Sequence, residues 1–225
     1  MAKLDYDYII IGAGAAGLLL ADALGKDSFF YQKNILILDK DAKKNNDRTW
    51  CLREKGKGQF DNLLYKTWNH IAFKGKDFSE SYAIAPYTYK MIRGIDFYEH
   101  YFEKFKDYSN ILFQQEAVKE IEESMGTVVV HTDGNQYICK KVFDSRFNYD
   151  MIEADGPYPV IQQHFIGWII KTPKPVFEVD QATYMDFSIP QKDNTRFMYV
   201  LPFQKDTALV EYTLFSEDSI IKNRI

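Results

Sequence analysis

Short apolar runs separated by polar segments predict a chain of many strands and few helices. The run at 7–11 (DYIII) predicts a strand buried on both faces, and a glycine-rich turn and a helical pattern at 18–24 follow it. A second buried strand is predicted at 34–38. Aromatic residues at helical spacing predict an amphipathic helix over 94–108, and Ile111–Phe113 then predicts the next parallel strand.

The other segments show weaker patterns, which predict mostly extended structure. They are a polar loop over 40–58, a helix over 60–66, strands at 69–74, 82–91, 118–122, 128–132 and 137–143, and four aromatic-rich strands of an antiparallel meander after residue 160. The pattern favours an α/β fold with a Rossmann-like domain over residues 1–155 and an antiparallel substrate-binding sheet over 156–225. A strand insertion near 68–91 is expected to join that second sheet.

Composition excludes several classes of protein. The 225 residues are 46% hydrophobic, which is enough apolar material for a folded core. A net charge of −4 argues against a nucleic-acid partner. Cys51 and Cys139 form no CxxC pair, and the four histidines lack ligand spacing, so we expect neither a disulfide scaffold nor a metal site.

The apolar stretch Tyr8–Gly25 approaches the length of a membrane-spanning segment. Asp5 and Asp7 precede it where a signal peptide carries basic residues, and Asp22 interrupts it. We therefore expect a strand, turn and helix here, in a cytoplasmic protein with no signal peptide or transmembrane segment.

That turn reads Gly12-Ala13-Gly14-Ala15-Ala16-Gly17, a G-x-G-x-x-G between a strand and a helix. Gly12 would permit the tight turn, Gly14 would admit a pyrophosphate, and Gly17 would let the helix pack on the strand. Asp39 ends the second strand, 22 positions after Gly17. In dinucleotide-binding proteins an acidic residue at about this spacing accepts hydrogen bonds from the ribose hydroxyls. Lys40 follows Asp39 directly. This combination predicts a dinucleotide site that includes Ala15, Ala16 and Lys40. The alternative is a helix and strand packed through small residues with no ligand.

The motif alone does not separate FAD from NAD. Its position at the N-terminus resembles the flavoprotein superfamily with a glutathione-reductase-like fold and its β-meander, which implies FAD.

Further segments resemble the lycopene cyclase family, flavoproteins that close the end rings of carotenoids. They are IIIGAGAAGLLLA near the N-terminus, NDRTWCL at 46–52, FDSR at 143–146, QHFIGWII at 163–170, YMDF at 184–187 and RFMYVLPFQKDTALVEYTLFS at 196–216. Two departures stand out. The family's acidic motif is commonly Glu-Glu-Thr and here reads Glu211-Tyr212-Thr213. Family members also continue past residue 225, so the chain is expected to be an N-terminal portion.

Strand alternation places Leu209, Glu211, Thr213 and Phe215 on one face. Glu211 is the only charge among mostly apolar neighbours, and burial would raise its pKa and keep it protonated, as a general acid requires. The resemblance implies that Glu211 protonates a terminal double bond of lycopene and so starts a non-redox cyclisation to β-carotene. It also implies reduced FAD, with NADPH as its reductant. The alternative to a catalytic role is that Glu211 lies on a solvent-exposed strand face.

The resemblance also implies roles for other residues. Arg48 and Trp50 are expected to contact the flavin, while Asp144 and Arg146 either contact flavin or substrate or form a structural ion pair. Aromatic side chains are expected to line the substrate pocket, namely Phe165, Trp168, Tyr184, Phe187, Phe197 and Tyr199. Because lycopene lies in the bilayer, the protein is expected to be peripheral to the membrane. Two alternatives stay open: a redox flavoprotein such as a monooxygenase or prenyl reductase, and a folded but inactive fragment.

Overall fold

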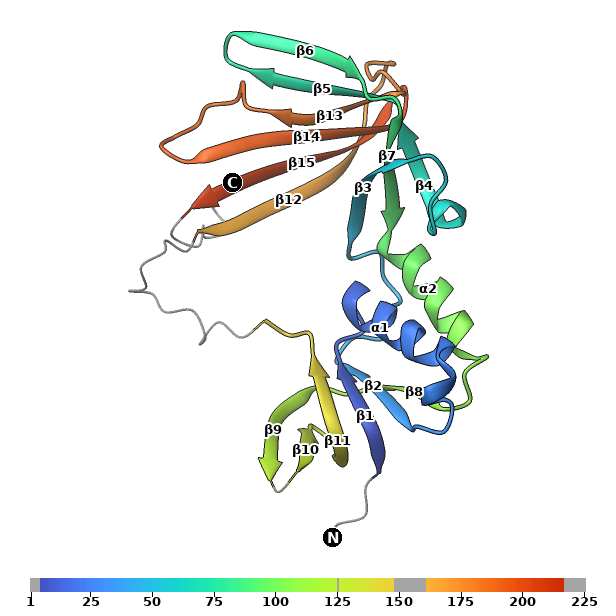
Figure 1. The fold of residues 1–225 in the computed structure, drawn as a ribbon. Coiled ribbons are helices and arrows are strands. Elements are labelled where there is room, and N and C mark those ends of the chain that lie inside the picture. Colours follow the sequence, from blue (N-terminus) through green and yellow to red (C-terminus); the bar gives the residue numbers. More distant parts are fainter. Residues whose placement is uncertain (1–4, 125, 148–160, 217–225) are drawn as a thin grey trace. The chain divides into compact units, whose positions relative to one another are not determined.

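The computed structural model describes residues 5–124, 126–147 and 161–216 (Figure 1). The chain divides into two compact units. The first comprises residues 1–48 and 93–149, and the second comprises residues 49–92 and 150–225. The segment assigned to the second unit is therefore longer than the strand insertion expected near 68–91, because it begins at residue 49.

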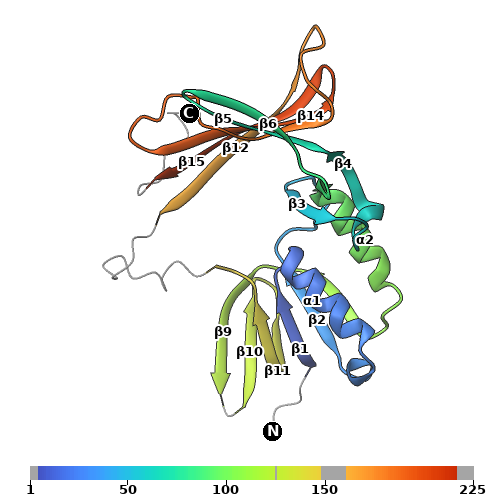
Figure 2. The same cartoon turned by 45° about the horizontal axis from the view of Figure 1, so that its top comes forward.

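The first unit is built on one six-stranded sheet. Its elements are β1 (Tyr6–Ile11), α1 (Ala15–Lys26), a 3-10 turn η1 (Ser28–Phe30), β2 (Ile35–Asp39), α2 (Gly94–Phe105), β8 (Ile111–Gln115), β9 (Val118–Ser124), β10 (Thr127–Thr132) and β11 (Gln136–Asp144). The strand order is β8-β2-β1-β11-β10-β9. The pairings from β8 through β2 and β1 to β11 are parallel, whereas β11, β10 and β9 are antiparallel (Figure 2). These strands and both long helices confirm the predicted order.

The centre of this sheet is buried on both faces, as its unbroken apolar runs predict. Ile9, Leu36 and Leu38 pack with Val130 and Cys139 on one face. On the other face, α1 lies against β1 and β2 (Figure 1). The amino end of α1 therefore sits at the carboxyl edge of the parallel strands, where α/β sheets bind ligands.

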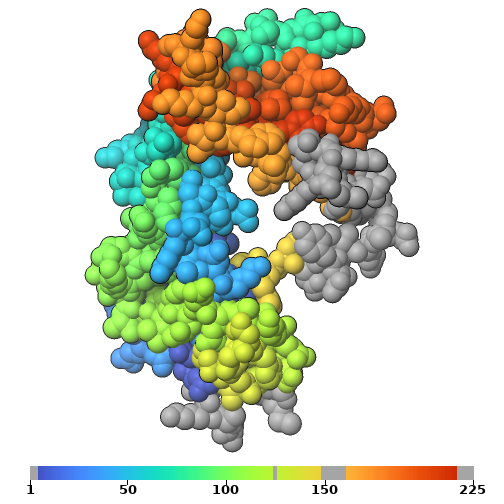
Figure 3. Space-filling view, turned by 180° about the vertical axis from the view of Figure 1, so that it is seen from behind, coloured from blue at the N-terminus to red at the C-terminus, as the bar shows by residue number. Residues whose placement is uncertain are grey.

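The second unit is almost entirely strand. Its elements are β3 (Thr49–Lys55), a 3-10 turn η2 (Asp61–Leu63), β4 (Leu64–Trp68), β5 (His70–Gly75), β6 (Phe78–Ala83), β7 (Tyr87–Arg93), β12 (Gln162–Lys171), β13 (Gln181–Asp186), β14 (Thr195–Gln204) and β15 (Thr207–Ser216). The large sheet has the order β12-β15-β14-β13-β5-β6, and the small sheet β3-β7-β4. Figure 3 shows the surface of β5 and β6 continuous with that of the orange and red strands.

Several details of this unit differ from the sequence prediction. Residues 40–58 are not all loop, because β3 occupies 49–55. The helix expected over 60–66 is wrong: only the short η2 forms, and β4 starts at Leu64. Trp68 at the end of β4 is fully buried, and this tertiary packing overrides the local helical pattern.

The later strands are also not a simple meander. β13, β14 and β15 are sequential antiparallel neighbours, but β12 lies beside β15 and β13 pairs in parallel with β5. With fifteen strands and two α-helices among the described residues, the α/β description fits the first unit only.

A cluster of buried side chains joins the two sheets of the second unit. Trp68, Tyr89 and Met91 from the small sheet pack with Ala182 and Leu201 from the large one. The indole Nε1 of Trp68 donates a hydrogen bond of 3.0 Å to the carbonyl oxygen of Pro202 on β14. This contact fixes the small sheet against the large sheet. Within the part of the chain that the structure describes, no helix is long and apolar enough to cross a bilayer.

Replacing Trp68 should separate these sheets. We expect Trp68→Ala to lower the free energy of unfolding by about 3–5 kcal/mol because it leaves a large cavity. Trp68→Phe should lower the free energy of unfolding by about 1–3 kcal/mol, because the carbonyl oxygen of Pro202 loses its hydrogen-bond donor. Urea denaturation followed by circular dichroism measures both, with the exposed Tyr82→Ala as control. Equal stability of Trp68→Ala and wild type would contradict this packing.

Candidate functional site

The glycine-rich turn between β1 and α1 in the first unit, residues 12–17, is called the cradle below. Gly12 has a φ of +101°, a conformation that side chains rarely adopt. A Cβ on Gly17 would lie 1.9 Å from the carbonyl oxygen of Gly12, whereas a Cβ on Gly14 would meet no atom within 4 Å. Gly17 is thus required by packing, as the sequence predicts, and Gly14 borders open space.

The first turn of α1 is suited to an anion. Gly14 is the N-cap and supplies no side-chain hydrogen bond, and Ala15 and Ala16 add only methyl groups. The turn holds no acidic residue. Backbone N–H groups at the positive end of the helix dipole are therefore available to a phosphate.

Asp39 is held at the same edge of the sheet. Its Oδ2 accepts a hydrogen bond of 2.7 Å from the backbone N–H of Ala13, and its Oδ1 accepts one of 2.8 Å from Asp41. The Nζ of Lys43 lies 3.3 Å from Oδ2. Each carboxylate oxygen has further acceptor capacity, which suits ribose hydroxyls. Lys40 is exposed, and its carbonyl accepts a hydrogen bond from Gln115.

The NDRTWCL segment, residues 46–52, is divided between the two units after residue 48. Asp47 accepts a hydrogen bond of 2.9 Å from the Tyr98 hydroxyl, and the carbonyl of Arg48 accepts one from the N–H of Gly94. Trp50 lies on β3 in the second unit. The structure thus ties Asp47 and Arg48 to α2.

Asp144 and Arg146 form an ion pair with an N–O distance of 2.7 Å. The Nη1 of Arg146 also donates a hydrogen bond to the carbonyl oxygen of Val118. These contacts connect the end of β11 to β9. They agree with the alternative that Asp144 and Arg146 form a structural ion pair.

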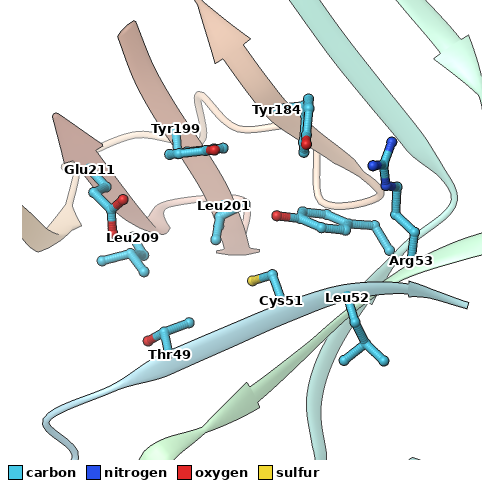
Figure 4. Close-up of a pocket in the computed structure, with 10 residues that line it drawn as sticks. Thr49, Cys51, Leu52, Arg53, Tyr184, Tyr199, Leu201, Leu209 and Glu211 are labelled. Atoms are coloured by element: carbon cyan, nitrogen blue, oxygen red, sulfur yellow. The ribbon is translucent and has the colours of Figure 1, made fainter. Parts of the chain in front are cut away.

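A pocket of about 360 Å³ lies within the second unit (Figure 4). Strands β3 and β7 supply one side of it, and β13, β14 and β15 supply the other. The lining residues are Thr49, Cys51, Leu52, Arg53, Tyr89, Tyr184, Tyr199, Leu201, Leu209 and Glu211.

Glu211 is the carboxyl group of this pocket. Burial raises its pKa, and a hydrogen bond of 3.2 Å from the Thr213 hydroxyl to Oε1 opposes that rise. Burial also raises the pKa of Cys51 to about 11 and raises that of Tyr199. The pocket thus disfavours negative charge, which favours the protonated form of Glu211 that a proton donor requires.

Aromatic faces surround the middle of the pocket. The ring centroids of Tyr89 and Tyr184 are 5.9 Å apart, and those of Tyr184 and Tyr199 are 6.0 Å apart, both edge-to-face. The guanidinium of Arg53 lies 5.2 Å from the centroid of Tyr184. Figure 4 shows Glu211 and Arg53 at opposite ends of this group. Such faces can stabilise a cation.

Of the six aromatic residues expected to line a pocket, Tyr184 and Tyr199 do so. Phe165 and Trp168 lie on β12 with exposures of 59% and 44%. Phe187 packs against Phe197 with ring centroids 5.1 Å apart. None of these four lines this pocket.

The sequence analysis missed the residues that β3 and β7 contribute, chiefly Thr49, Cys51, Arg53 and Tyr89. The alternation Thr49, Cys51, Arg53 in TWCLREK is the signal that could have revealed them. Elsewhere in the described ranges, no group of three or more His, Cys, Asp or Glu is placed to hold a metal ion.

The fold is shared with solved structures of low sequence identity. A halogenase, PltM, in complex with phloroglucinol and FAD has a TM-score of 0.66 and 11% identity over 93% of this chain and 51% of its own. A flavoprotein/dehydrogenase from Cytophaga hutchinsonii has a TM-score of 0.62 and 15% identity over 93% of this chain and 55% of its own. The tetracycline destructase Tet(51) has a TM-score of 0.57 and 12% identity over 98% of this chain and 59% of its own. The chain therefore spans little more than half the length of these proteins.

The model of the lycopene cyclase protein family matches residues 7–224. The chain belongs to this family. No curated protein matches its sequence.

The two glycines of the cradle should respond differently to substitution. Gly17→Ala forces α1 away from β1 and should lower the free energy of unfolding by about 1–3 kcal/mol or more. Gly14→Ala should cost no more than about 1 kcal/mol, because its Cβ meets open space and Ala is only a poorer N-cap. Chemical denaturation measures both, and equal losses would contradict the packing role of Gly17.

The raised pKa of Glu211 predicts a pH-dependent stability. The folded state holds the proton more tightly than the unfolded chain, whose carboxyl has a pKa near 4.5. The stabilisation is therefore present below that value and is lost as the pH rises through the folded pKa. Glu211→Gln should be more stable than wild type near pH 8, with the difference narrowing as the pH falls toward 4.5. The exposed Glu178→Gln serves as control, and thermal melts across pH that show no such difference would contradict the burial of this carboxyl.

Proposed function

We propose that this protein is a lycopene cyclase that forms β-carotene without net redox change. The observation that carries the proposal is a Glu with a raised pKa, Glu211, in a pocket bordered by aromatic faces. Membership of the lycopene cyclase protein family supports it. Glu211 would donate its proton to a terminal double bond, the next double bond would attack the resulting carbocation, and loss of a proton would complete the ring.

The other pocket residues would bind the hydrocarbon substrate and stabilise the carbocation, and they would not transfer protons. The faces of Tyr184 and Tyr199 would stabilise the carbocation, and Leu201 and Leu209 would contact hydrocarbon. A volume of about 360 Å³ is at the small end of ligand sites and suits one end of a carotene rather than its whole length.

The cradle of the first unit would hold FAD. The pyrophosphate would accept hydrogen bonds from the backbone N–H groups of Ala15, Ala16 and Gly17, and the missing side chain of Gly14 would leave room for it. Asp39 would accept hydrogen bonds from the ribose hydroxyls. When bound and reduced, with NADPH as reductant, the flavin would supply negative charge near the cation. The open cradle and the FAD in the related halogenase complex support this cofactor.

A bilayer substrate implies contact with the membrane. Exposed apolar side chains would provide it, and β12 carries five of them in the described residues: Phe165, Ile166, Trp168, Ile169 and Ile170. We propose a peripheral association on this basis.

A redox flavoprotein is the second candidate, because the fold is shared with a halogenase and a flavoprotein/dehydrogenase. Such an enzyme would consume NADPH in proportion to product, whereas a cyclase would not.

Expression of the gene in lycopene-accumulating bacteria tests the proposal. Pigment chromatography should show cyclic carotenes with wild type and with Glu178→Gln. Glu211→Gln should reduce cyclisation by about 10²–10⁴-fold, because the general acid is lost, while flavin binding survives.

Retained cyclisation in Glu211→Gln would refute the assignment of the acid. Unchanged lycopene beside soluble yellow protein would favour the redox flavoprotein. A folded but colourless protein that stays colourless with added FAD would favour an inactive fragment.

A further inference from the structure

The two oxygens of the Glu211 carboxyl group have different surroundings. Oε1 accepts a hydrogen bond of 3.2 Å from the Thr213 hydroxyl. Among the described residues no hydrogen-bond donor is found for Oε2. One oxygen is thus fixed by the protein and the other is open to a reaction partner.

Thr213 is well placed to hold Oε1. It lies two residues after Glu211 on β15, so both side chains project from the same face of the strand. Its side chain is completely buried between the rows of β12 and β14, where Phe165 and Phe197 are its register partners. A β-branched side chain has few allowed χ1 rotamers in such packing, and in the structure the hydroxyl is directed at the carboxyl group.

The space beside Oε2 depends on a glycine of β12. Gly167 is the register partner of Glu211, and a Cβ at this position would lie 3.8 Å from Oε2 and 3.2 Å from Cδ1 of Leu209. Every larger side chain here would extend toward the carboxyl group. Gly167 therefore leaves Oε2 uncovered on the side of β12.

We infer that Thr213 is a positioning residue that fixes Oε1, that Oε2 carries the transferable proton, and that Gly167 keeps this oxygen accessible. The inference rests on the proposed function. In the proton transfer, the Oε2–H bond breaks and a C–H bond forms at the terminal double bond. The electron pair stays on the carboxylate, whose charge the Thr213 donor then stabilises through Oε1.

Other titratable groups of the pocket do not complicate a titration of Glu211. Burial raises the pKa of Cys51 on β3 to about 11, and it raises those of Tyr89 on β7 and Tyr199 on β14 above their usual value. Tyr184 on β13 and Arg53 on β3 also line the pocket. Glu211 is the carboxyl group among these residues, and the titration follows its protonation.

Infrared titration of the purified protein tests the role of Thr213 without requiring turnover. The protonated carboxyl band that disappears in Glu211→Gln identifies Glu211. In Thr213→Val the charged form loses its donor, so the midpoint should rise by roughly one pH unit. Thr213→Ser should restore the wild-type midpoint, and Thr183→Val, which alters a buried hydroxyl of β13 outside the pocket, should leave it unchanged. An unchanged midpoint in Thr213→Val would overturn the role of Thr213.

Turnover in the lycopene-accumulating cells, compared at equal amounts of folded protein, tests the role of Gly167. Conversion should fall from wild type through Gly167→Ala to Gly167→Val, by about tenfold or more for Val, while the Glu211 band still titrates. The Ala variant keeps the test valid if the Val variant does not fold. Undiminished conversion in folded Gly167 variants would overturn the access role. Failure of the proposed function is separate, because it would appear as unchanged lycopene with the wild type or as cyclisation that survives Glu211→Gln.

Discussion

The packing of the small sheet on the large sheet is the interaction on which the second unit depends. Trp68 and Tyr89 insert against Ala182 and Leu201, and the same contact brings β3 and β7 over the row of side chains that ends at Glu211. Without it, Glu211 would lie on a solvated strand face and have an ordinary carboxyl pKa. Removal of water by hydrophobic packing is therefore what raises the pKa of this carboxyl group.

The sequence alone was sufficient where local rules decide the structure. The glycines at 12, 14 and 17 and the acid at 39 follow from turn, helix and strand geometry, and period-two alternation placed Glu211 and Thr213 on one face. It was insufficient where tertiary contacts decide. TWCLREK is polar and short, so its pairing as β3, and with it Cys51 and Arg53 in the pocket, depends on a partner strand supplied by β7.

The departure of Glu211-Tyr212-Thr213 from the family's usual acidic motif has a simple structural account. Tyr212 projects from the opposite face of β15 to Glu211, and its hydroxyl accepts a hydrogen bond of 2.9 Å from Nη1 of the buried Arg196. An acid at that position would meet Arg196 rather than the pocket. The middle position therefore belongs to the packing of the opposite face, whereas Glu211 lines the pocket and Thr213 is buried beside it.

The two ends of the large sheet are chemically unlike. β6 exposes a mixed set of side chains that includes Ser79, Glu80 and Ser81 as well as Phe78 and Tyr82, whereas β12 exposes mainly aliphatic and aromatic side chains on both of its faces. A polar edge strand resists addition of a further strand, and an apolar one favours it. Growth of this sheet by pairing with another polypeptide is thus directional. Among the described residues it is more favoured at β12, whose exposed side chains are mainly apolar, than at β6, which carries the charged Glu80.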